Sequence, residues 1–375
     1  MYKRRVIKKL SSAGISINEP DADPKASIEV HDDKFYVRCA LNGSLGFGET
    51  YADGLWDCRH LDEIVYRILN SGISTRGISD MIVALRSVLF NMQNKVRARR
   101  VAKDHYDVDT DVFEWMLDPY MQYTCGYWNQ ADSLNASQTE KMDLIIRKLG
   151  LKAGDEVLDI GCGWGGFAKY AAQNYGIRMF GLSISQSQLK YASRLCEGLD
   201  CTFRFGDYRD LAQIYPQKFD AITIIGVTEH IGYKNLKGLH KIMRDRLNPN
   251  GLVLLHAITH MESCRYVEPF IDRYIFPGGM VPSVEQLSTA MKHCFVLEDV
   301  HNFGADYDLT LMAWHQNFAR AKQQIIAEKQ LGERFYRVWE YYLLTCAGMF
   351  RARKAQLMQM VLSPRGVSGG YSSIR

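Results

Sequence analysis

A glycine-rich loop follows an apolar run in the stretch EVLDIGCGWGG, residues 156–166. In an open parallel sheet, a loop of this kind lies at the carboxyl edge of the strands, where ligands bind. Its four glycines are Gly161, Gly163, Gly165 and Gly166. Gly161 permits a tight turn, and Gly163 removes a side chain where a ligand must approach the backbone. Because the Gly161-x-Gly163-x-x-Gly166 spacing also satisfies the dinucleotide fingerprint, the loop alone fits more than one nucleotide-like ligand.

Two features of the flanking sequence favour S-adenosylmethionine over a nicotinamide dinucleotide. Asp159, just before the loop, can pair with an amino-acid ammonium group, whereas it would repel a pyrophosphate. No Asp or Glu lies between Asp159 and Glu197, so the ribose-binding acid expected about 20 residues after the loop of a dinucleotide site is missing. Further on, the string GDYRDL offers Asp207 and Tyr208, which we expect to hold an adenine by hydrogen bonding and stacking.

Strand-like and helix-like segments alternate from residue 139 onward. The predicted strands are 156–160, 177–182, 201–205, 219–226 and 252–258, and the predicted helices are 139–150, 167–175, 187–196 and 235–247. Such alternation predicts an α/β fold with a mostly parallel, doubly wound sheet covered on both faces. Beyond it, 309–316 is predicted as a strand and 333–354 as a long helix.

The first 95 residues are predicted to be mostly helical, because apolar side chains recur there at helical spacing. Residues 42–58 contain four glycines but lack the Gly-Lys-Ser/Thr ending of a phosphate loop, so a turn-rich loop is expected. We therefore divide the chain into an N-terminal, mostly helical domain (1–100) and a catalytic, cofactor-binding domain (101–375) whose lead-in is 101–138.

Composition limits the classes of function. The net charge of +4 over 375 residues is too small to indicate nucleic acid. Nine cysteines without a CxxC pair or a cysteine–histidine cluster argue against a disulfide framework and a metal site. No signal peptide and no run of membrane-spanning length is expected. The basic runs 1–9, 95–103 and 351–354 are read as solvated faces or as contacts to an anionic membrane.

Several longer strings resemble the cyclopropane fatty acid synthase family. They are GSLGFGETYADG, KDHYDVDTDVFEWMLDPYMQYTCGYW, LDIGCGWGG, EHIG, YIFPGG, HNFGADYDLTLMAW and CAGMFRAR. The resemblance covers nearly the whole chain. It implies a class I S-adenosylmethionine-dependent methyltransferase fold with an added N-terminal lipid-handling domain. It implies transfer of a methylene group to the cis double bond of an acyl chain in a membrane phospholipid.

The same resemblance implies a set of site residues. A bicarbonate ion acting as the base is expected to contact Cys125, Glu229, His256, Ile258 and Tyr307. S-adenosylmethionine is expected at the glycine loop and at Tyr123, Thr124, Asp159, Ser185, Gln188, Asp207 and Tyr208. The resemblance also suggests a homodimer in the cytoplasm, attached peripherally to the inner face of the membrane, with the phospholipid bilayer as its partner.

The implied chemistry is consistent with these residue types. An isolated alkene is a weak nucleophile, so the sulfonium methyl must be held in line with it and shielded from water. Methyl transfer leaves a carbocation, and a weak base must then remove a proton so that the ring closes. A carboxylate or thiolate beside the methyl group could itself be alkylated, whereas a bound bicarbonate avoids this.

Other functions and plainer roles remain open from the sequence. A methyltransferase that does not close a ring, a nicotinamide oxidoreductase and a non-catalytic lipid-binding protein are the alternatives. Cys125 also fits a small core position, and His256 lies in an apolar run where a hydrogen-bonded core histidine is common. Tyr307 lies in a polar turn, where exposure is the usual outcome.

Overall fold

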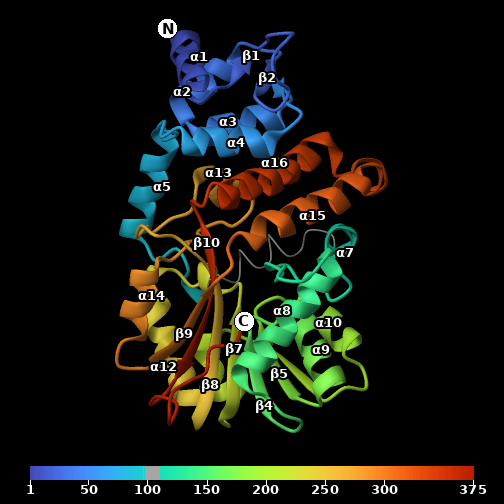
Figure 1. Cartoon of the computed structure of the whole chain (residues 1–375), viewed down its shortest axis with the longest axis vertical. Coiled ribbons are helices and arrows are strands. Elements are labelled where there is room, and N and C mark those ends of the chain that lie inside the picture. The colour runs from blue at the N-terminus through green and yellow to red at the C-terminus, as the bar shows by residue number, and fades with distance from the viewer. Residues whose placement is uncertain (96, 98–109) are drawn as a thin grey trace. The chain divides into compact units, whose positions relative to one another are not determined.

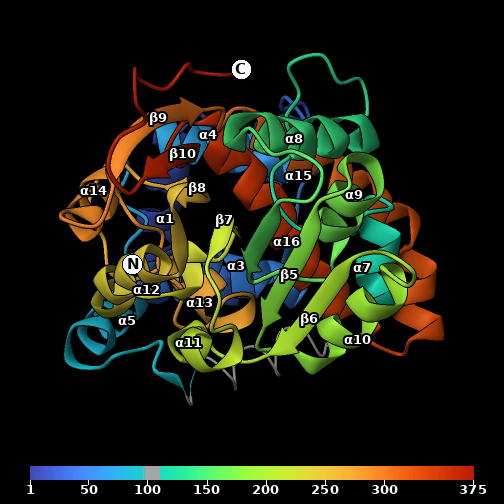
Figure 2. The same ribbon diagram turned by 90° about the horizontal axis from the view of Figure 1, so that it is seen from below.

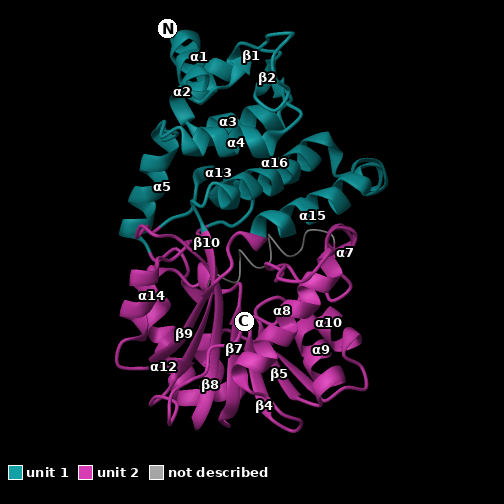
Figure 3. Cartoon of the chain, viewed as in Figure 1, with its two compact units in different colours: residues 1–90, 266–277, 307–355 teal, residues 91–265, 278–306, 356–375 magenta. Residues whose placement is uncertain are grey.

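The structure is a computed structural model that describes residues 1–95, 97 and 110–375 (Figure 1). The chain forms two compact units, and each is built from several separate segments (Figure 3). Unit 1 comprises residues 1–90, 266–277 and 307–355, and unit 2 comprises 91–265, 278–306 and 356–375. This partition differs from the linear division at residue 100, because segments from late in the chain complete the core of unit 1.

Unit 1 is mostly helical, as its sequence predicts. Its helices are α1 (Tyr2–Ser12), α2 (Lys34–Asn42), α3 (Ser44–Ala52), α4 (Leu61–Asn70), α5 (Ile78–Leu89), α13 (Pro269–Tyr274), α15 (Asp306–Arg320), the π-helix η4 (Gln324–Glu328) and α16 (Gly332–Arg351). Three short strands, β1 (Ser16–Ile17), β2 (Ser27–Val30) and β3 (Trp56–Asp57), pair in the order β1-β2-β3. Helix α16 packs against α3 and α4 and confirms the long helix expected near the C-terminus.

Two predictions within unit 1 are wrong. Residues 42–58 hold helix α3 instead of a turn-rich loop, because its glycines serve close packing: a Cβ at Gly48 would lie 2.4 Å from the Phe270 ring. Residues 309–316 belong to helix α15 instead of a strand. Its buried residues Leu311, Trp314 and Phe318 recur at spacings of three and four, and such a short apolar run is ambiguous between helix and strand.

Unit 2 carries the predicted α/β sheet. Its strands are β4 (Glu156–Ile160), β5 (Arg178–Ser183), β6 (Cys201–Phe205), β7 (Phe219–Ile225), β8 (Leu247–Thr259), β9 (Val296–Asn302) and β10 (Gln356–Ser363). They pair in the order β6-β5-β4-β7-β8-β10-β9, and the five strands from β6 to β8 are parallel. Only β10, inserted antiparallel between β8 and β9, breaks the parallel pattern.

Helices cover both faces of this sheet (Figure 2). Among the described residues, the helices of unit 2 are α7 (Thr110–Met116), α8 (Leu134–Leu149), α9 (Gly166–Tyr175), α10 (Gln186–Leu195), α11 (Leu211–Ile214), α12 (Leu236–Arg246) and α14 (Val284–Met291), with short 3-10 turns η1 (Tyr208–Asp210), η2 (Thr228–His230) and η3 (Tyr233–Asn235). One apolar core lies between the sheet and α8 and α9, and another lies between the sheet and α12 and α14. The fold class predicted for this part of the chain is therefore confirmed.

Candidate functional site

The glycine loop joins β4 to α9 at the carboxyl edge of the sheet. Gly161 has φ +80° in the left-handed region, and a Cβ there would lie 2.3 Å from Val227 Cγ2. Gly163 also has positive φ, but a Cβ on it would meet no atom of the described residues within 4 Å. Glycine is thus required at Gly161 by the protein itself, whereas at Gly163 it keeps the backbone open to space that a ligand can fill.

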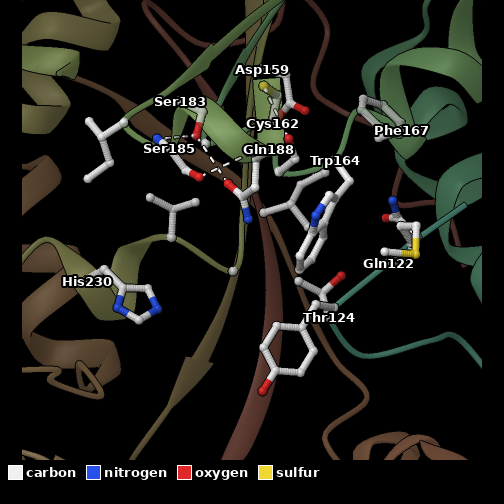
Figure 4. A pocket seen from close by; sticks show the side chains of 18 of the residues that line it. Gln122, Thr124, Asp159, Cys162, Trp164, Phe167, Ser183, Ser185, Gln188 and His230 are labelled. Atoms are coloured by element: carbon white, nitrogen blue, oxygen red, sulfur yellow. Dashed lines mark hydrogen bonds between the residues drawn. The ribbon is translucent and has the colours of Figure 1, made fainter. Parts of the chain in front are cut away.

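A cavity of about 160 Å³ lies against this loop (Figure 4). Its lining comes from 121–124, the glycine loop with its flanking residues Asp159 and Phe167, 183–188 at the end of β5, 225–230 at the end of β7, and Gln93. Seven of the predicted cofactor residues line it together: Tyr123, Thr124, Asp159, Gly161, Gly163, Ser185 and Gln188. The tertiary structure thus gathers most of the predicted cofactor set, from three separate parts of the chain, around one space.

Three predicted cofactor residues lie outside that lining. Gly165 packs the start of α9, where a Cβ would lie 2.7 Å from the Ala192 Cβ. Asp207 accepts hydrogen bonds from Arg209 at 2.6 Å from Nε and 2.7 Å from a terminal nitrogen. Tyr208 is buried in the core beneath the sheet edge, and the Arg209 guanidinium lies 5.0 Å from its ring centroid.

The loop after β5 is held by its own hydrogen bonds. The Ser185 hydroxyl caps α10 by accepting from the Gln188 backbone N–H at 3.3 Å. The Ser183 hydroxyl donates to Gln188 Oε1 at 3.2 Å, which leaves the amide nitrogen of Gln188 for the cavity (Figure 4). The hydroxyls and amides of this loop therefore occupy the place where many nucleotide sites carry an acidic residue.

Asp159 brings a buried carboxyl group to the cavity. It is 3% exposed and accepts one hydrogen bond, from the Thr223 hydroxyl at 2.8 Å. Burial raises the pKa of Asp159 to about 6, although the Thr223 hydrogen bond opposes the shift. A cationic group entering the cavity would stabilise the ionised form, as an amino-acid ammonium does.

Glu229 and His256 form a second polar region at the same sheet edge. Glu229, in turn η2 after β7, accepts the Ile258 backbone N–H of β8 at 2.6 Å through Oε1. His256, on β8, pairs with Gln359 of β10, whose Nε2 lies 3.3 Å from His256 Nδ1. This hydrogen bond holds the Glu229 side chain against β8, two residues beyond His256. Because the Ile258 N–H donates to Glu229, it is not available to a ligand.

Both side chains carry buried atoms that lack a partner. Within the described residues, Glu229 Oε2 and His256 Nε2 have no hydrogen-bond partner. Burial raises the pKa of Glu229 to about 7 and lowers the pKa of His256 well below its ordinary value, so the imidazole is neutral. Because the Gln359 amide nitrogen can only donate, His256 Nδ1 accepts and Nε2 carries the proton. An acceptor and a donor that are both buried without partners are costly, and a bound polar group would relieve that cost.

Cys125 and Tyr307 lie in different surroundings. Cys125 is fully buried in unit 2, and its thiol donates to the Gly126 carbonyl at 3.2 Å. Tyr307 belongs to unit 1, where its ring packs 4.5 Å from that of Phe350, measured between centroids. Tyr307 is 7% exposed, so it is buried and does not lie in an exposed turn.

Lys141 on α8 was not predicted and lies close to both polar regions. Its ammonium group is fully buried and donates to Gln122 Oε1 (2.9 Å), Thr124 Oγ1 (2.7 Å) and Gln138 Oε1 (2.6 Å). Burial lowers its pKa to about 8, and its charge acts on Asp159, Cys125 and His256. The sequence did carry a signal, because Lys141 lies four residues before Ile145 and eight before Leu149 on the apolar face of α8.

Comparison with known proteins assigns the family. The chain matches the family model "Mycolic acid cyclopropane synthetase" over residues 93–360. It is 46% identical to the cyclopropane-fatty-acyl-phospholipid synthase of Escherichia coli K12, over 98% of this chain and 94% of the relative. The chain belongs to the cyclopropane synthase family. It is therefore an S-adenosylmethionine-dependent methyltransferase, and the predicted family and enzyme class are confirmed.

Other cyclopropane synthase relatives differ in name and in bound ligands. A probable fatty acid methyltransferase of Mycobacterium tuberculosis is 36% identical, over 73% of this chain and 66% of its own length. The structure of the mycolic acid cyclopropane synthase CmaA1, in complex with S-adenosylhomocysteine and CTAB, is 28% identical with a TM-score of 0.63, over 70% of this chain and 97% of that one. S-adenosylmethionine as methyl donor is thereby supported for this synthase.

The residues of this synthase fit that cofactor. Gly163 opens the backbone to the cavity, Asp159 offers a buried carboxyl group for an ammonium, and Ser185 with Gln188 offers polar atoms for a ribose. When bound, the sulfonium supplies an electrophilic methyl group. Among the described residues, no cluster of His, Cys, Asp and Glu could hold a metal ion, and no helix is long and apolar enough to cross a membrane.

Proposed function

We propose that this synthase transfers a methylene group from S-adenosylmethionine to the cis double bond of an unsaturated acyl chain in a membrane phospholipid, forming a cyclopropane ring. The observation that carries the proposal is the buried Glu229–His256 pair, whose Oε2 and Nε2 lack partners among the described residues. The names of the E. coli relative and of the family model support the same reaction.

The Glu229–His256 pair suits an oxyanion that also carries a proton. His256 Nε2 would donate to such an ion, and Glu229 Oε2 would accept its O–H group. Bicarbonate has both functions and, when bound, supplies a weak base that the sulfonium does not readily alkylate. We propose that Cys125 completes this site, and that the Ile258 N–H positions the Glu229 carboxyl group. A role for Tyr307, which belongs to unit 1, stays a prediction.

The cofactor would be held by the residues that line the cavity: Tyr123, Thr124, Asp159, Gly161, Gly163, Ser185 and Gln188. Gly165 would act by letting α9 begin close to α10. A contact of Asp207 and Tyr208 with adenine stays a prediction, and such a contact would share the Asp207 carboxylate with Arg209.

The alternative is methyl transfer to an acyl chain without ring closure, which the name of the M. tuberculosis relative favours. The two reactions share every step up to the carbocation and differ in which proton leaves. Loss from the new methyl group closes the ring, whereas loss from the chain leaves a methylated alkene. The group that faces the new methyl group therefore decides the product.

Incubation with vesicles of unsaturated phospholipid and labelled S-adenosylmethionine tests the proposal. The expected fatty acid gains one CH₂ unit and resists mild hydrogenation as a ring. A product of the same mass that takes up hydrogen as an alkene would favour the alternative. Turnover in buffer freed of carbon dioxide should fall and recover on addition of bicarbonate, and a rate independent of bicarbonate would remove that ion from the proposal.

Access to such a substrate requires a membrane surface. We propose that the synthase associates peripherally with the inner face of the cytoplasmic membrane through unit 1, and that it acts as a homodimer. Of the three basic runs, 95–103 lies mostly outside the described residues. In the third run, Arg351 is engaged within unit 1 by Asp308 and Asp62 at 2.9 Å and 2.7 Å. On α1, Arg4, Arg5 and Lys8 are exposed, whereas Lys3 pairs with Asp33 at 2.8 Å; Arg353 and Lys354 of the third run are exposed as well.

A further inference from the structure

Figure 1 shows helix α5 in unit 1. Most of the apolar side chains of this helix are exposed to solvent. Its exposed apolar residues and their exposed fractions are Ile78 (53%), Met81 (73%), Ile82 (54%), Leu85 (61%), Val88 (52%) and Leu89 (61%). Their spacing of three, four and seven residues places them in one stripe along the helix. An ordinary helix of a soluble protein buries such a stripe, and contiguous exposed apolar surface of this kind marks an interaction site.

Polar contacts fix this orientation from the opposite side of the helix. The Ser79 hydroxyl donates to the Asn42 carbonyl at 2.9 Å, and Ser79 is buried. Asp80 accepts the Gly77 backbone N–H at 2.8 Å, and Arg86 lies 4.0 Å from Asp272 of α13. The Ser79 contact holds one side of α5 against the body of unit 1, and the apolar stripe on the other side stays exposed.

Cationic side chains surround the start of this helix. A mostly apolar cavity of about 170 Å³ adjoins the residues before α5, and Arg5, Lys9 and Arg76 line it. The Lys9 ammonium donates to the Ser74 carbonyl at 2.7 Å, which ties the end of α1 to the segment that leads into α5. Between residues 71 and 90 the sole acidic residue is Asp80, which is engaged with the Gly77 N–H.

We propose that α5 is the membrane-docking element of this enzyme: its apolar stripe enters the interface of an anionic phospholipid bilayer, and the cations near its start meet the lipid phosphates. The inference rests on the proposed phospholipid substrate and names the surface that reaches it. Amphipathic helices bind in this way, lying in the plane of the interface with basic residues at the headgroups. A helix of 12 residues is too short to span a bilayer and suits the interface.

A second copy of the chain is the less suitable occupant of the stripe. Two α5 helices packed against each other would bring their basic neighbours Arg76 and Arg86 together, and like charges repel. An anionic bilayer instead offers opposite charge at the headgroups and apolar acyl chains just beneath them. The charges around α5 therefore favour a lipid surface.

Co-sedimentation of the full chain with vesicles tests the proposal in the absence of any methyl donor. The vesicles contain phosphatidylglycerol and phosphatidylethanolamine, with pure phosphatidylcholine vesicles as the uncharged comparison. The double variant Met81→Gln/Leu85→Gln should bind the anionic vesicles about 30-fold more weakly, because two apolar side chains no longer leave water. The matched control Val296→Gln/Leu297→Gln, at exposed positions of β9 (43% and 39%), should bind like the wild type.

Further measurements separate the outcomes. Arg76→Gln should weaken binding to anionic vesicles severalfold and leave the weak binding to phosphatidylcholine unchanged. Because the α5 substitutions replace exposed side chains, Tm should not fall. Wild-type vesicle affinity in the double variant would overturn the proposal, as would a dimer-to-monomer change without loss of vesicle binding. Since no donor is present, vesicle binding without any product in a separate assay would count against the proposed reaction and leave the docking helix in place.

Discussion

The glycine-loop cavity and the Glu229–His256 pair share one sheet edge but differ in how their polar groups are satisfied. Around the cavity, Ser183, Ser185 and Gln188 hydrogen-bond one another, so this wall is fixed before a ligand arrives. In the Glu229–His256 pair, one atom of each side chain is buried without a partner in the described part of the chain. The first region therefore suits a large ligand that fits a preformed wall, and the second suits the small polar ion that we propose for it, because that ion would supply the missing hydrogen bonds.

The largest effect in this comparison is expected for Glu229→Gln. The amide keeps the shape but removes the acceptor that we propose for bicarbonate, so turnover should fall about 100- to 1,000-fold. Stabilisation by S-adenosylhomocysteine in a thermal-shift assay should stay the same, because the cavity is separate. Glu262→Gln, at an exposed carboxylate of the same unit, is the control. Unchanged turnover in Glu229→Gln would remove Glu229 from the mechanism.

A smaller effect, confined to the other region, is expected for Gly161→Ala. The new Cβ would collide with Val227 at 2.3 Å and would distort the cavity wall, so S-adenosylhomocysteine should bind about tenfold more weakly or worse. Gly154→Ala is matched for backbone strain, since Gly154 has φ +88° but no atom in the described part of the chain lies within 4 Å of its Cβ position. Calorimetric titration of both variants with S-adenosylhomocysteine separates the effect of the Cβ collision from the effect of backbone strain. Equal affinities of the two variants for S-adenosylhomocysteine would show that the collision with Val227 does not weaken binding.

Lys141 contacts the cavity lining at Gln122 and Thr124, and its charge also acts on His256; Lys148 on the same helix provides the comparison. Lys141→Met would leave Gln122, Thr124 and Gln138 acceptors without their donor, so S-adenosylhomocysteine affinity should fall severalfold through Thr124. Lys148 instead lies 3.9 Å from Asp299, away from the cavity lining. Lys148→Met should lower Tm and spare affinity. Equal loss of affinity in the two variants would show that Lys141 acts only through stability.

The smallest expected effect is on the pH dependence of stability. In the folded protein the pKa of Glu229 is raised from 4.5 to about 7. The contribution of the protonated Glu229 to the free energy of unfolding is therefore fully present below pH 4.5 and is lost as pH rises through 7. Glu229→Gln should therefore gain stability relative to the wild type between pH 4.5 and 7, by a few degrees in Tm. A parallel pH dependence of Tm in the two proteins would show that the Glu229 carboxyl group titrates normally.

The sequence by itself determined the local features of this enzyme. The glycine spacing and the strand–helix alternation are set by backbone conformation and by hydrophobic period, which act within a few residues. The structure has the glycine turn and the five parallel strands where they were predicted. The same local reasoning failed at 309–316, because a short apolar run satisfies two periods equally well.

Only the tertiary structure decided which distant residues meet. Strand β10, which was not predicted, brings Gln359 to His256 and thereby sets the protonated nitrogen of the imidazole. Burial raised the pKa of Glu229. The packing of distant segments placed the Lys141 ammonium group among neutral acceptors and left the apolar stripe of α5 exposed. These outcomes depend on desolvation and on contacts between residues far apart in the chain, which no local pattern of residue types encodes.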